Sequence, residues 1–387
     1  MERGRPPGYC VSRLGVKPAA THLSGQNKAM PHDEISLLAR IANDFKIKPF
    51  IPFRLLKQGD AQTLVAYFWP RRFRLRDHYS DEQRLFEVEP GSKVLAHCRW
   101  QPNRAEQPTL VMWHGMEGST ASAYMLTTAD KMFRTGFNVV RVNFRNCGGT
   151  EHLSPTLYHG GLTGDLRAVI DELIARDHLS RIFVAGFSLG GNMVLKLAGE
   201  YGDDPPAEVK AVCAVSPSID LRASTTLIAR RRNWVYQQDF LRRLKNRIKL
   251  KDKLFPGRYD ASLLNGIRSV EQFDNQYVAP HFGFADANDY YAKASSRPLI
   301  GRIRIPTLII HAKDDPFIPF DPMRDPSIAS NPYVLLIATE QGGHVAFVSA
   351  NTGEERFWAE SRVIDFCKLV AANSNSLDAG NGEYGVR

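Results

Sequence analysis

Short runs of uniformly apolar residues alternate with stretches of helical periodicity along most of this 387-residue chain. Strands that are apolar on both faces are typical of a parallel sheet that helices cover on its two sides. The alternation therefore predicts an α/β fold with a mostly parallel central sheet, right-handed crossovers and flanking helices. The expected strands are residues 109–113, 138–142, 181–185, 211–215, 307–310 and 333–337, and the expected helices include residues 166–174, 189–197 and 357–370.

Shorter β-type runs precede this region. Residues 62–68, 84–88 and 93–98 are expected to form early strands, and the turn residues Glu89-Pro90-Gly91 separate the last two.

The chain is expected to consist of an arm and one large domain. Residues 1–48 are polar, rich in Gly and Pro and aperiodic, which predicts a flexible basic arm, and residues 49–387 would form the α/β domain. Residues 216–306 show no clear buried strand, but they carry aromatic side chains among basic ones. A structureless loop of this length is uncommon. We therefore expect a helical lid insertion at approximately 217–300, over the carboxyl edge of the sheet where ligands bind in such folds.

The net charge of the chain bears on whether it binds nucleic acid or a membrane. Lys and Arg number 50 against 41 Asp and Glu, a net charge of +9, with much of the excess in Arg230-Arg231-Arg232 and residues 242–253. No zinc-finger, KH or RNP-like spacing accompanies this excess, so we expect no nucleic acid partner. The basic segment indicates either a solvated helix face or peripheral contact with an anionic membrane surface.

Membrane-spanning and secreted classes are not expected. No stretch approaches the roughly 18 consecutive apolar residues that a spanning helix needs. Five scattered cysteines and a polar N-terminus without an apolar leader predict a cytoplasmic location.

One motif indicates a nucleophile. The segment Gly186-Phe187-Ser188-Leu189-Gly190-Gly191 follows an expected strand and opens an expected helix. This is the setting of a G-x-S-x-G nucleophile elbow, in which the glycines leave room for a tight turn. Ser188 is therefore predicted to be the nucleophile. The plainer alternative is a serine that only caps the helix.

A serine nucleophile needs a base and an acid that orients the base. His344 follows the last expected strand and suits the chain order serine, acid, histidine. The acid is expected just after residues 307–310, where Asp314 and Asp315 compete. Pro316 and Pro319 favour Asp315, because prolines commonly stand directly after the acid and four residues after it in related loops. Asp314 would then cap the loop.

An oxyanion hole needs two backbone N–H donors. The residue after the nucleophile, Leu189, supplies one of them in this arrangement. The loop at residues 114–119, His-Gly-Met-Glu-Gly-Ser, follows the expected strand 109–113, and the N–H of Met116 is the natural second donor.

Neither a cofactor nor a metal is expected. His114, His152 and His159 lack the spacing of a metal site. Neither a dinucleotide-binding nor a P-loop glycine pattern occurs, and Cys147, which has no obvious base of its own, is expected to be structural.

Together these motifs resemble the α/β-hydrolase superfamily and, within it, the YheT-like (ABHD1/ABHD3-type) branch of esterases. The resemblance runs from about Pro52 to the C-terminal helix. Its markers are residues 114–119, 143–145, 159–161 with 165–166, 186–192, 312–317 and 342–344, and the insertion resembles the lid of the branch at residues 220–221, 273–274 and 290–291. Asn146 stands where the branch has glycine.

This resemblance implies hydrolysis of carboxylic esters or lipids. We therefore expect a serine carboxylesterase that acts through Ser188, His344 and Asp315 on short- or medium-chain acyl or lipid esters. Two alternatives stay open: an acyltransferase that uses the same triad to move the acyl group to an alcohol, and a non-catalytic basic adaptor associated with membrane or RNA.

Overall fold

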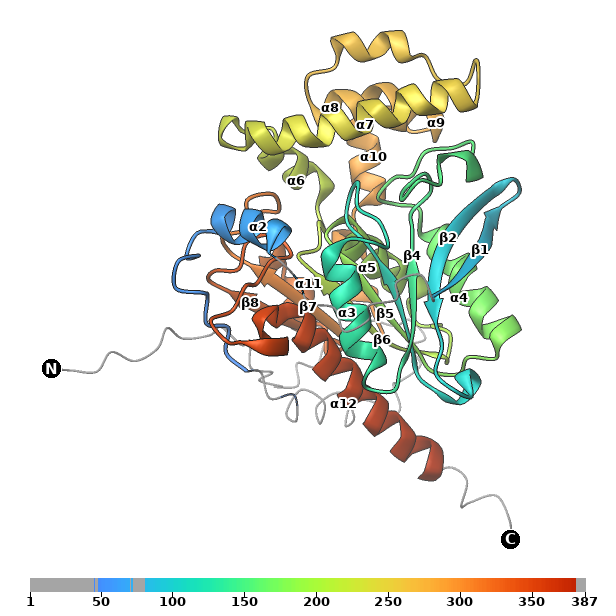
Figure 1. The fold of residues 1–387 in the computed structure, drawn as a ribbon, viewed down its shortest axis with the longest axis vertical. Helices are drawn as coiled ribbons and strands as arrows, with labels where there is room; N and C mark the ends of the chain where they lie inside the picture. Colours follow the sequence, from blue (N-terminus) through green and yellow to red (C-terminus); the bar gives the residue numbers. More distant parts are fainter. Residues whose placement is uncertain (1–44, 46–47, 70, 72–80, 381–387) are drawn as a thin grey trace, which may run out of the picture.

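The computed structural model describes residue 45, residues 48–69, residue 71 and residues 81–380. Figure 1 shows these residues as a sheet with helices on both faces and a further group of helices above one end of the strands. The basic arm expected at residues 1–48 lies outside the described residues, apart from Phe45 and Lys48.

The central sheet has eight strands in the order β1-β2-β4-β3-β5-β6-β7-β8. The pairs β1–β2 and β2–β4 are antiparallel, and the remaining pairs are parallel. The predicted α/β fold with a mostly parallel sheet is confirmed. The strands are β1 (Glu82–Glu89), β2 (Ser92–Arg99), β3 (Thr109–Trp113), β4 (Asn138–Val142), β5 (Ile182–Phe187), β6 (Val209–Val215), β7 (Thr307–Ala312) and β8 (Val334–Thr339).

Helices cover both faces of the sheet, which explains why its central strands β3 and β5 are almost entirely apolar. In β3, Leu110 and Met112 point into the cluster that α3 and α12 complete, whereas Val111 and Trp113 point into the cluster that α4 and α5 complete. The helices outside the insertion are α2 (Gly59–Phe68), α3 (Ala123–Phe133), α4 (Thr163–Asp177), α5 (Leu189–Tyr201), α11 (Pro326–Ser330) and α12 (Trp358–Gly380), with short turns η2 (Arg104–Glu106), η3 (Glu151–Leu153), η7 (Arg297–Arg302), η8 (Asp321–Arg324) and η9 (Gly353–Arg356).

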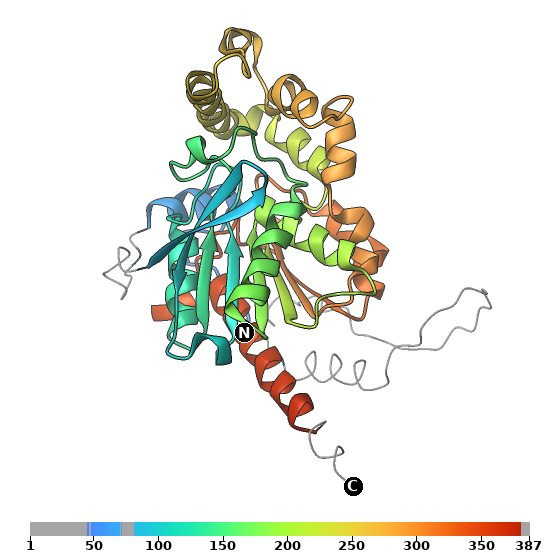
Figure 2. The same cartoon turned by 90° about the vertical axis from the view of Figure 1, so that its right-hand side faces the viewer.

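A helical insertion lies between β6 and β7 and has no strand among its described residues. Figure 2 shows its helices above the sheet. Its buried residues, among them Leu244, Phe273 and Tyr290, belong to the same core cluster as α4 and α5, so it packs onto the domain. It comprises α6 (Leu221–Ile228), η4 (Arg231–Asn233), α7 (Trp234–Leu254), η5 (Ala261–Gly266), α8 (Val270–Phe273), η6 (Asp274–Val278), α9 (Ala279–His281) and α10 (Ala287–Ala294).

One predicted strand is wrong. Residues 62–68 lie in the helix α2, whose buried residues Gly59, Gln62 and Ala66 are spaced three and four apart. The Gln62 amide fixes this helix, because it donates to the Leu56 and Val348 carbonyls and accepts from the Val348 N–H. Val348 is distant in sequence from Gln62, so the local run of β-type residues could not indicate this contact, and the prediction of a strand from that run was wrong. The early strands at 84–88 and 93–98 are confirmed as β1 and β2.

Within the part of the chain that the structure describes, no helix is both long enough and apolar enough to cross a bilayer.

Candidate active site

Ser188 occupies the sharp turn between β5 and α5. Its backbone lies at φ 54° and ψ −117°, a region that residues other than glycine rarely adopt. The flanking glycines allow the close approach behind it. A Cβ at Gly186 would lie 2.2 Å from the Gly190 carbonyl oxygen, and a Cβ at Gly190 would lie 2.5 Å from the His114 carbonyl oxygen. The turn therefore presents a strained serine at the carboxyl edge of the sheet.

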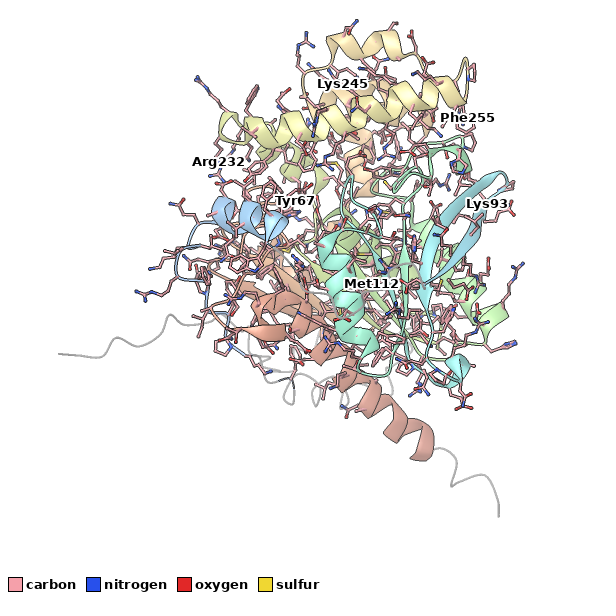
Figure 3. The ribbon with its side chains drawn as sticks, viewed as in Figure 1. Tyr67, Lys93, Met112, Arg232, Lys245 and Phe255 are labelled. Atoms are coloured by element: carbon pink, nitrogen blue, oxygen red, sulfur yellow. The ribbon has the colours of Figure 1, made fainter. Side chains whose placement is uncertain are left out.

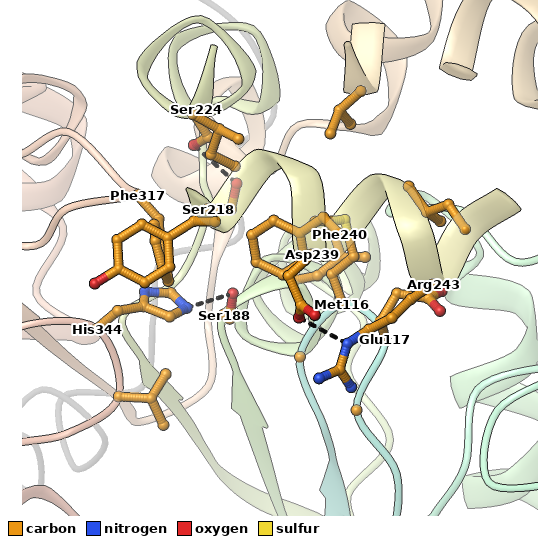
Figure 4. Close-up of a pocket in the computed structure, with 18 of the residues that line it drawn as sticks. Met116, Glu117, Ser188, Ser218, Ser224, Asp239, Phe240, Arg243, Phe317 and His344 are labelled. Carbon is orange, nitrogen blue, oxygen red and sulfur yellow. Dashed lines mark hydrogen bonds and ion pairs between the residues drawn. The ribbon is translucent and has the colours of Figure 1, made fainter. Parts of the chain in front are cut away.

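The three side chains predicted to act together lie in one hydrogen-bonded chain. His344 Nε2 lies 2.9 Å from Ser188 Oγ, and His344 Nδ1 lies 2.8 Å from Asp315 Oδ2. Figure 4 shows the imidazole directed at the serine hydroxyl. When Nδ1–H donates to the carboxylate, Nε2 is free to accept the serine proton. This arrangement can activate a hydroxyl as a nucleophile.

Of the two competing carboxylates, it is Asp315 that contacts the histidine. Its other oxygen accepts from the Phe317 and Ile318 N–H groups at 2.8 and 2.9 Å. Burial alone would raise the pKa of the Asp315 carboxyl, but the charge of His344 and these hydrogen bonds hold it below the ordinary value. Asp315 is therefore ionised and oriented at neutral pH.

Asp314 points elsewhere. Its Oδ1 accepts from the Gly343 N–H at 2.9 Å, while its Oδ2 is buried without a partner among the described residues. Burial raises the pKa of the Asp314 carboxyl to about 6. Asp314 thus holds the loop that carries His344, as a loop-capping residue would.

Replacing Asp314 with asparagine is expected to stabilise the protein at neutral pH. Because the folded-state pKa lies above 3.8, the folded protein binds more protons here than the unfolded chain between about pH 4 and pH 6, so stability falls as the pH rises. Asparagine still accepts from the Gly343 N–H but cannot ionise. In urea unfolding, D314N should exceed the wild type by on the order of 1 kcal/mol at pH 7.5, since this half-buried group is partly screened, and should nearly match it at pH 4. An equal difference at both pH values would contradict this assignment.

Further residues position the His344 loop, and no sequence motif marked them. The His344 N–H donates to Thr63 Oγ1 at 2.9 Å, and the Thr63 hydroxyl donates to the Gly59 carbonyl at 2.7 Å. The Val345 N–H donates to Ser216 Oγ at 3.1 Å. Thr63 belongs to α2. Residues 62–68, which were wrongly predicted to form a strand, therefore support His344, the candidate base.

The loop at residues 114–119 runs directly beside Ser188, since a Cβ at Gly115 would lie 3.0 Å from the Ser188 Cβ. Its N–H groups are nearly all occupied. Those of Gly115 and Glu117 donate to the hydroxyls of Tyr124 and Tyr158, and that of Gly118 donates to a loop carbonyl.

The Met116 N–H is the exception in this loop, because it has no acceptor among the described residues. Leu189 is the first residue of α5, and its N–H likewise lacks an acceptor within the helix. The two N–H groups predicted as oxyanion donors thus have no acceptor among the residues that the structure describes.

The histidines considered as metal ligands lie in other settings. His114 is fully buried: its Nδ1–H donates to the Gly115 carbonyl, its Nε2 accepts from the Phe144 N–H, and burial lowers its pKa to about 4. His159 packs against Phe282, and burial lowers its pKa to about 3. Among the described residues, no group of three or more His, Cys, Asp or Glu side chains could hold a metal ion.

A pocket of about 980 Å³ opens onto Ser188 and His344. Its floor includes Met116 and Leu189, and the insertion contributes apolar walls that include Leu221, Ile228, Phe240 and Tyr290. The volume is that of a site for a small molecule with an apolar part.

Comparison with known proteins identifies the family to which this chain belongs. The family model described as "alpha/beta hydrolase fold" matches residues 108–350, so the chain belongs to the α/β-hydrolase family. Within it, the chain belongs to the YheT-like branch. It is 34% identical over 331 residues to YheT of Escherichia coli (strain K12), which carries the name of an esterase, and the match covers 84% of this chain and 95% of that protein.

Two further similarities agree with this placement. The chain is 33% identical over 274 residues to the monoacylglycerol lipase of Saccharomyces cerevisiae, covering 68% of this chain and 59% of that protein. The solved structure of the Pyrococcus furiosus esterase Pf2001 has the same fold, with a TM-score of 0.51 at 18% identity over 77% of this chain and 97% of that chain.

Proposed function

We propose that this protein is a serine carboxylesterase whose nucleophile, base and acid are Ser188, His344 and Asp315. By family it is a carboxylic ester hydrolase. The observation that carries the proposal is the hydrogen-bonded chain from the Ser188 hydroxyl through His344 to Asp315 at one end of an apolar pocket.

The geometry suits a two-step acyl transfer. The Ser188 oxygen attacks the ester carbonyl while His344 Nε2 takes its proton, and the N–H groups of Met116 and Leu189 hold the oxyanion of the tetrahedral intermediate. His344 then returns the proton to the departing alcohol, which leaves an acyl-enzyme. Water, deprotonated by the same imidazole, attacks this acyl-enzyme and releases the acid. Asp315 keeps the imidazole in the tautomer that both steps require.

The pocket supports an ester with a short or medium acyl chain, or a lipid ester, as substrate. Its walls from the insertion are aliphatic and aromatic, and the similar lipase from yeast is named for a lipid ester. We infer that the insertion, at approximately residues 217–300, acts as the lid of this pocket. A cytoplasmic location is part of the same proposal, since Cys98, Cys147, Cys213 and Cys367 are free thiols.

Covalent labelling tests the proposal directly. A fluorophosphonate probe should modify the folded protein once, and peptide mapping should place the adduct on Ser188. Hydrolysis of p-nitrophenyl esters of increasing chain length should then rank the acyl preference, with alcohol added in parallel to detect acyl transfer. A folded protein that the probe does not label would instead favour the non-catalytic adaptor.

We further propose that the pocket mouth contacts an anionic membrane surface. Exposed apolar side chains gather there from two distant segments: Tyr67 and Phe68 from α2 are 66% and 76% exposed, and Trp234 and Val235 from α7 are 60% and 67% exposed. Tyr67, Phe68 and Val235 line the pocket itself. Residues 230–232, three exposed arginines, lie beside them, and Figure 3 shows Arg232 at the end of the insertion that lies above α2. Aromatic residues next to arginines suit a bilayer with anionic headgroups.

Vesicle co-sedimentation checks this surface. Binding to phosphatidylserine-containing vesicles should fall at least about tenfold when Arg230, Arg231 and Arg232 are all changed to glutamine, given roughly 1 kcal/mol per basic residue near such a surface. Trp234→Ser should also weaken binding. The control, Leu55→Ser, changes a side chain that is 84% exposed but does not line the pocket, and should have no effect. Binding that is independent of anionic lipid would refute the proposal.

A further inference from the structure

A buried ion pair joins the insertion to the loop beside the nucleophile. Arg247, on α7, approaches Glu117 with two nitrogens: Nη2 lies 2.8 Å from Oε2, and Nε lies 3.1 Å from Oε1. The two side chains are only 9% and 4% exposed. A bidentate pair of this kind fixes orientation as well as distance, because the planar guanidinium matches the carboxylate.

Glu117 is held from several directions. Its carboxylate also accepts from the Tyr158 hydroxyl at 2.8 Å, and its own N–H donates to that hydroxyl at 3.0 Å. Its backbone lies at φ 55°, in the left-handed region that glutamate rarely adopts. A conformation of this kind persists only when the surroundings enforce it, and here Arg247 and Tyr158 do so.

This anchoring acts on the residue next to it. Met116 stands between Glu117, fixed by Arg247 and Tyr158, and Gly115, whose N–H is fixed by Tyr124. Within the described part of the chain, the Met116 N–H is the group of this loop that has no acceptor. With both neighbours fixed, the Met116 N–H cannot turn without breaking the hydrogen bond of Gly115 or of Glu117. Such preorganisation is what a donor to a developing oxyanion requires.

Arg247 also neutralises the charge of the Glu117 carboxylate. Without the guanidinium, the Glu117 carboxylate would be a buried anion lacking its cation, next to the position where negative charge develops in the reaction. Breaking a buried pair by removing one partner is strongly destabilising, so the loop would rearrange to bring Glu117 to water.

We propose that Arg247 is a positioning residue: through Glu117 it holds the Met116 N–H in the geometry that binds the oxyanion, and so couples the insertion to the chemical step. The role in catalysis rests on the proposed esterase function. It assigns to α7 a task beyond lining the pocket, since Arg247 of this helix orients the Met116 N–H through Glu117.

Kinetics of Arg247→Met and Arg247→Lys test the proposal. Methionine fills similar space without charge, and kcat for a p-nitrophenyl ester should fall about 10- to 100-fold, with KM within about threefold. Affinity for a boronic acid, which forms a tetrahedral adduct on the serine, should fall in parallel with kcat. Lysine, which keeps the charge but not the bidentate geometry, should recover part of the loss. Arg222→Met removes an exposed Arg–Glu pair of the same insertion and should change none of these values.

A double variant separates positioning from a general loss of stability. If the unpaired Glu117 anion causes the damage, Arg247→Met combined with Glu117→Gln should be less impaired than Arg247→Met alone. Unchanged kcat and unchanged boronic acid affinity in Arg247→Met would overturn the proposal. If that variant does not fold, the same comparison of Arg247→Lys with the wild type decides the question.

Amide hydrogen exchange gives a readout that does not depend on catalysis. Exchange in the peptide that contains residues 114–119 should be faster in Arg247→Met than in the wild type or in Arg222→Met. If the wild type proved inactive towards esters while this difference held, the proposed function would fail but the structural coupling would stand. No difference in exchange would mean that Arg247 does not hold the loop.

Discussion

Changing Ser188 to alanine should lower kcat for p-nitrophenyl esters by about 10⁴- to 10⁶-fold. The expected loss is this large because, among the described residues, no other hydroxyl is hydrogen-bonded to the His344 imidazole, so the acyl-enzyme route closes entirely. Binding should survive, since the pocket walls and both N–H donors are unchanged. Steady-state kinetics, with substrate binding to the inactive variant measured separately, checks both expectations.

Ser180→Ala is the matched control for this experiment. Ser180 is an exposed serine just before the opposite end of β5, so its loss should leave the rate within about twofold of the wild type. Melting temperatures should show that both variants are folded. A Ser188→Ala protein that hydrolyses esters at the wild-type rate would show that the nucleophile lies elsewhere.

Changing Asp315 to asparagine should reduce kcat by about 10³- to 10⁴-fold with little change in KM. An asparagine amide at this position favours the imidazole tautomer with the proton on Nε2, which cannot accept the Ser188 proton, and it cannot stabilise the imidazolium that forms. The geometry would be almost unchanged, because the Asn oxygen can still accept from the Phe317 and Ile318 N–H groups. Pre-steady-state release of p-nitrophenol should show that acylation itself is slowed.

Asp314→Asn provides the contrast, because it removes the adjacent carboxylate and leaves the hydrogen bond from His344 to Asp315 in place. Its kcat should stay within tenfold of the wild type. If the two variants lost activity equally, or if Asp314→Asn lost more, the acid would be assigned to the wrong neighbour.

The sheet and its hairpin could be predicted from sequence because their signals are local. A strand buried on both faces is apolar at nearly every position, as in β3 and β5, and such runs are visible without knowledge of their partners. The helix α2 could not be predicted in this way. Leu64, Tyr67 and Phe68 are exposed there at the pocket mouth rather than buried in a sheet, and Gln62 is buried by contacts with Leu56 and Val348.

The candidate site shows the same division. The elbow around Ser188 is recognisable because a strained turn imposes glycines at fixed spacing, and the chain order places the acid and the histidine. Pro316 and Pro319 favoured Asp315 over Asp314 from sequence, but the orientation of the two side chains, with Asp315 towards His344 and Asp314 towards the Gly343 N–H, is visible only in the structure. Thr63 and Arg247 carry no motif at all, because their importance comes from contacts between segments far apart in the chain.

The helix α2 limits how far this enzyme can be truncated at its N-terminal side. The span that the family model matches, residues 108–350, begins well after Thr63. A fragment trimmed to that span would retain every side chain of the proposed triad. It would lose α2, and with it the Thr63 hydroxyl that accepts a hydrogen bond from the His344 N–H. We therefore expect a fragment limited to residues 108–350 to be less active than one that reaches back to Gly59, because only the longer fragment keeps the hydrogen bonds from Thr63 to Gly59 and from His344 to Thr63.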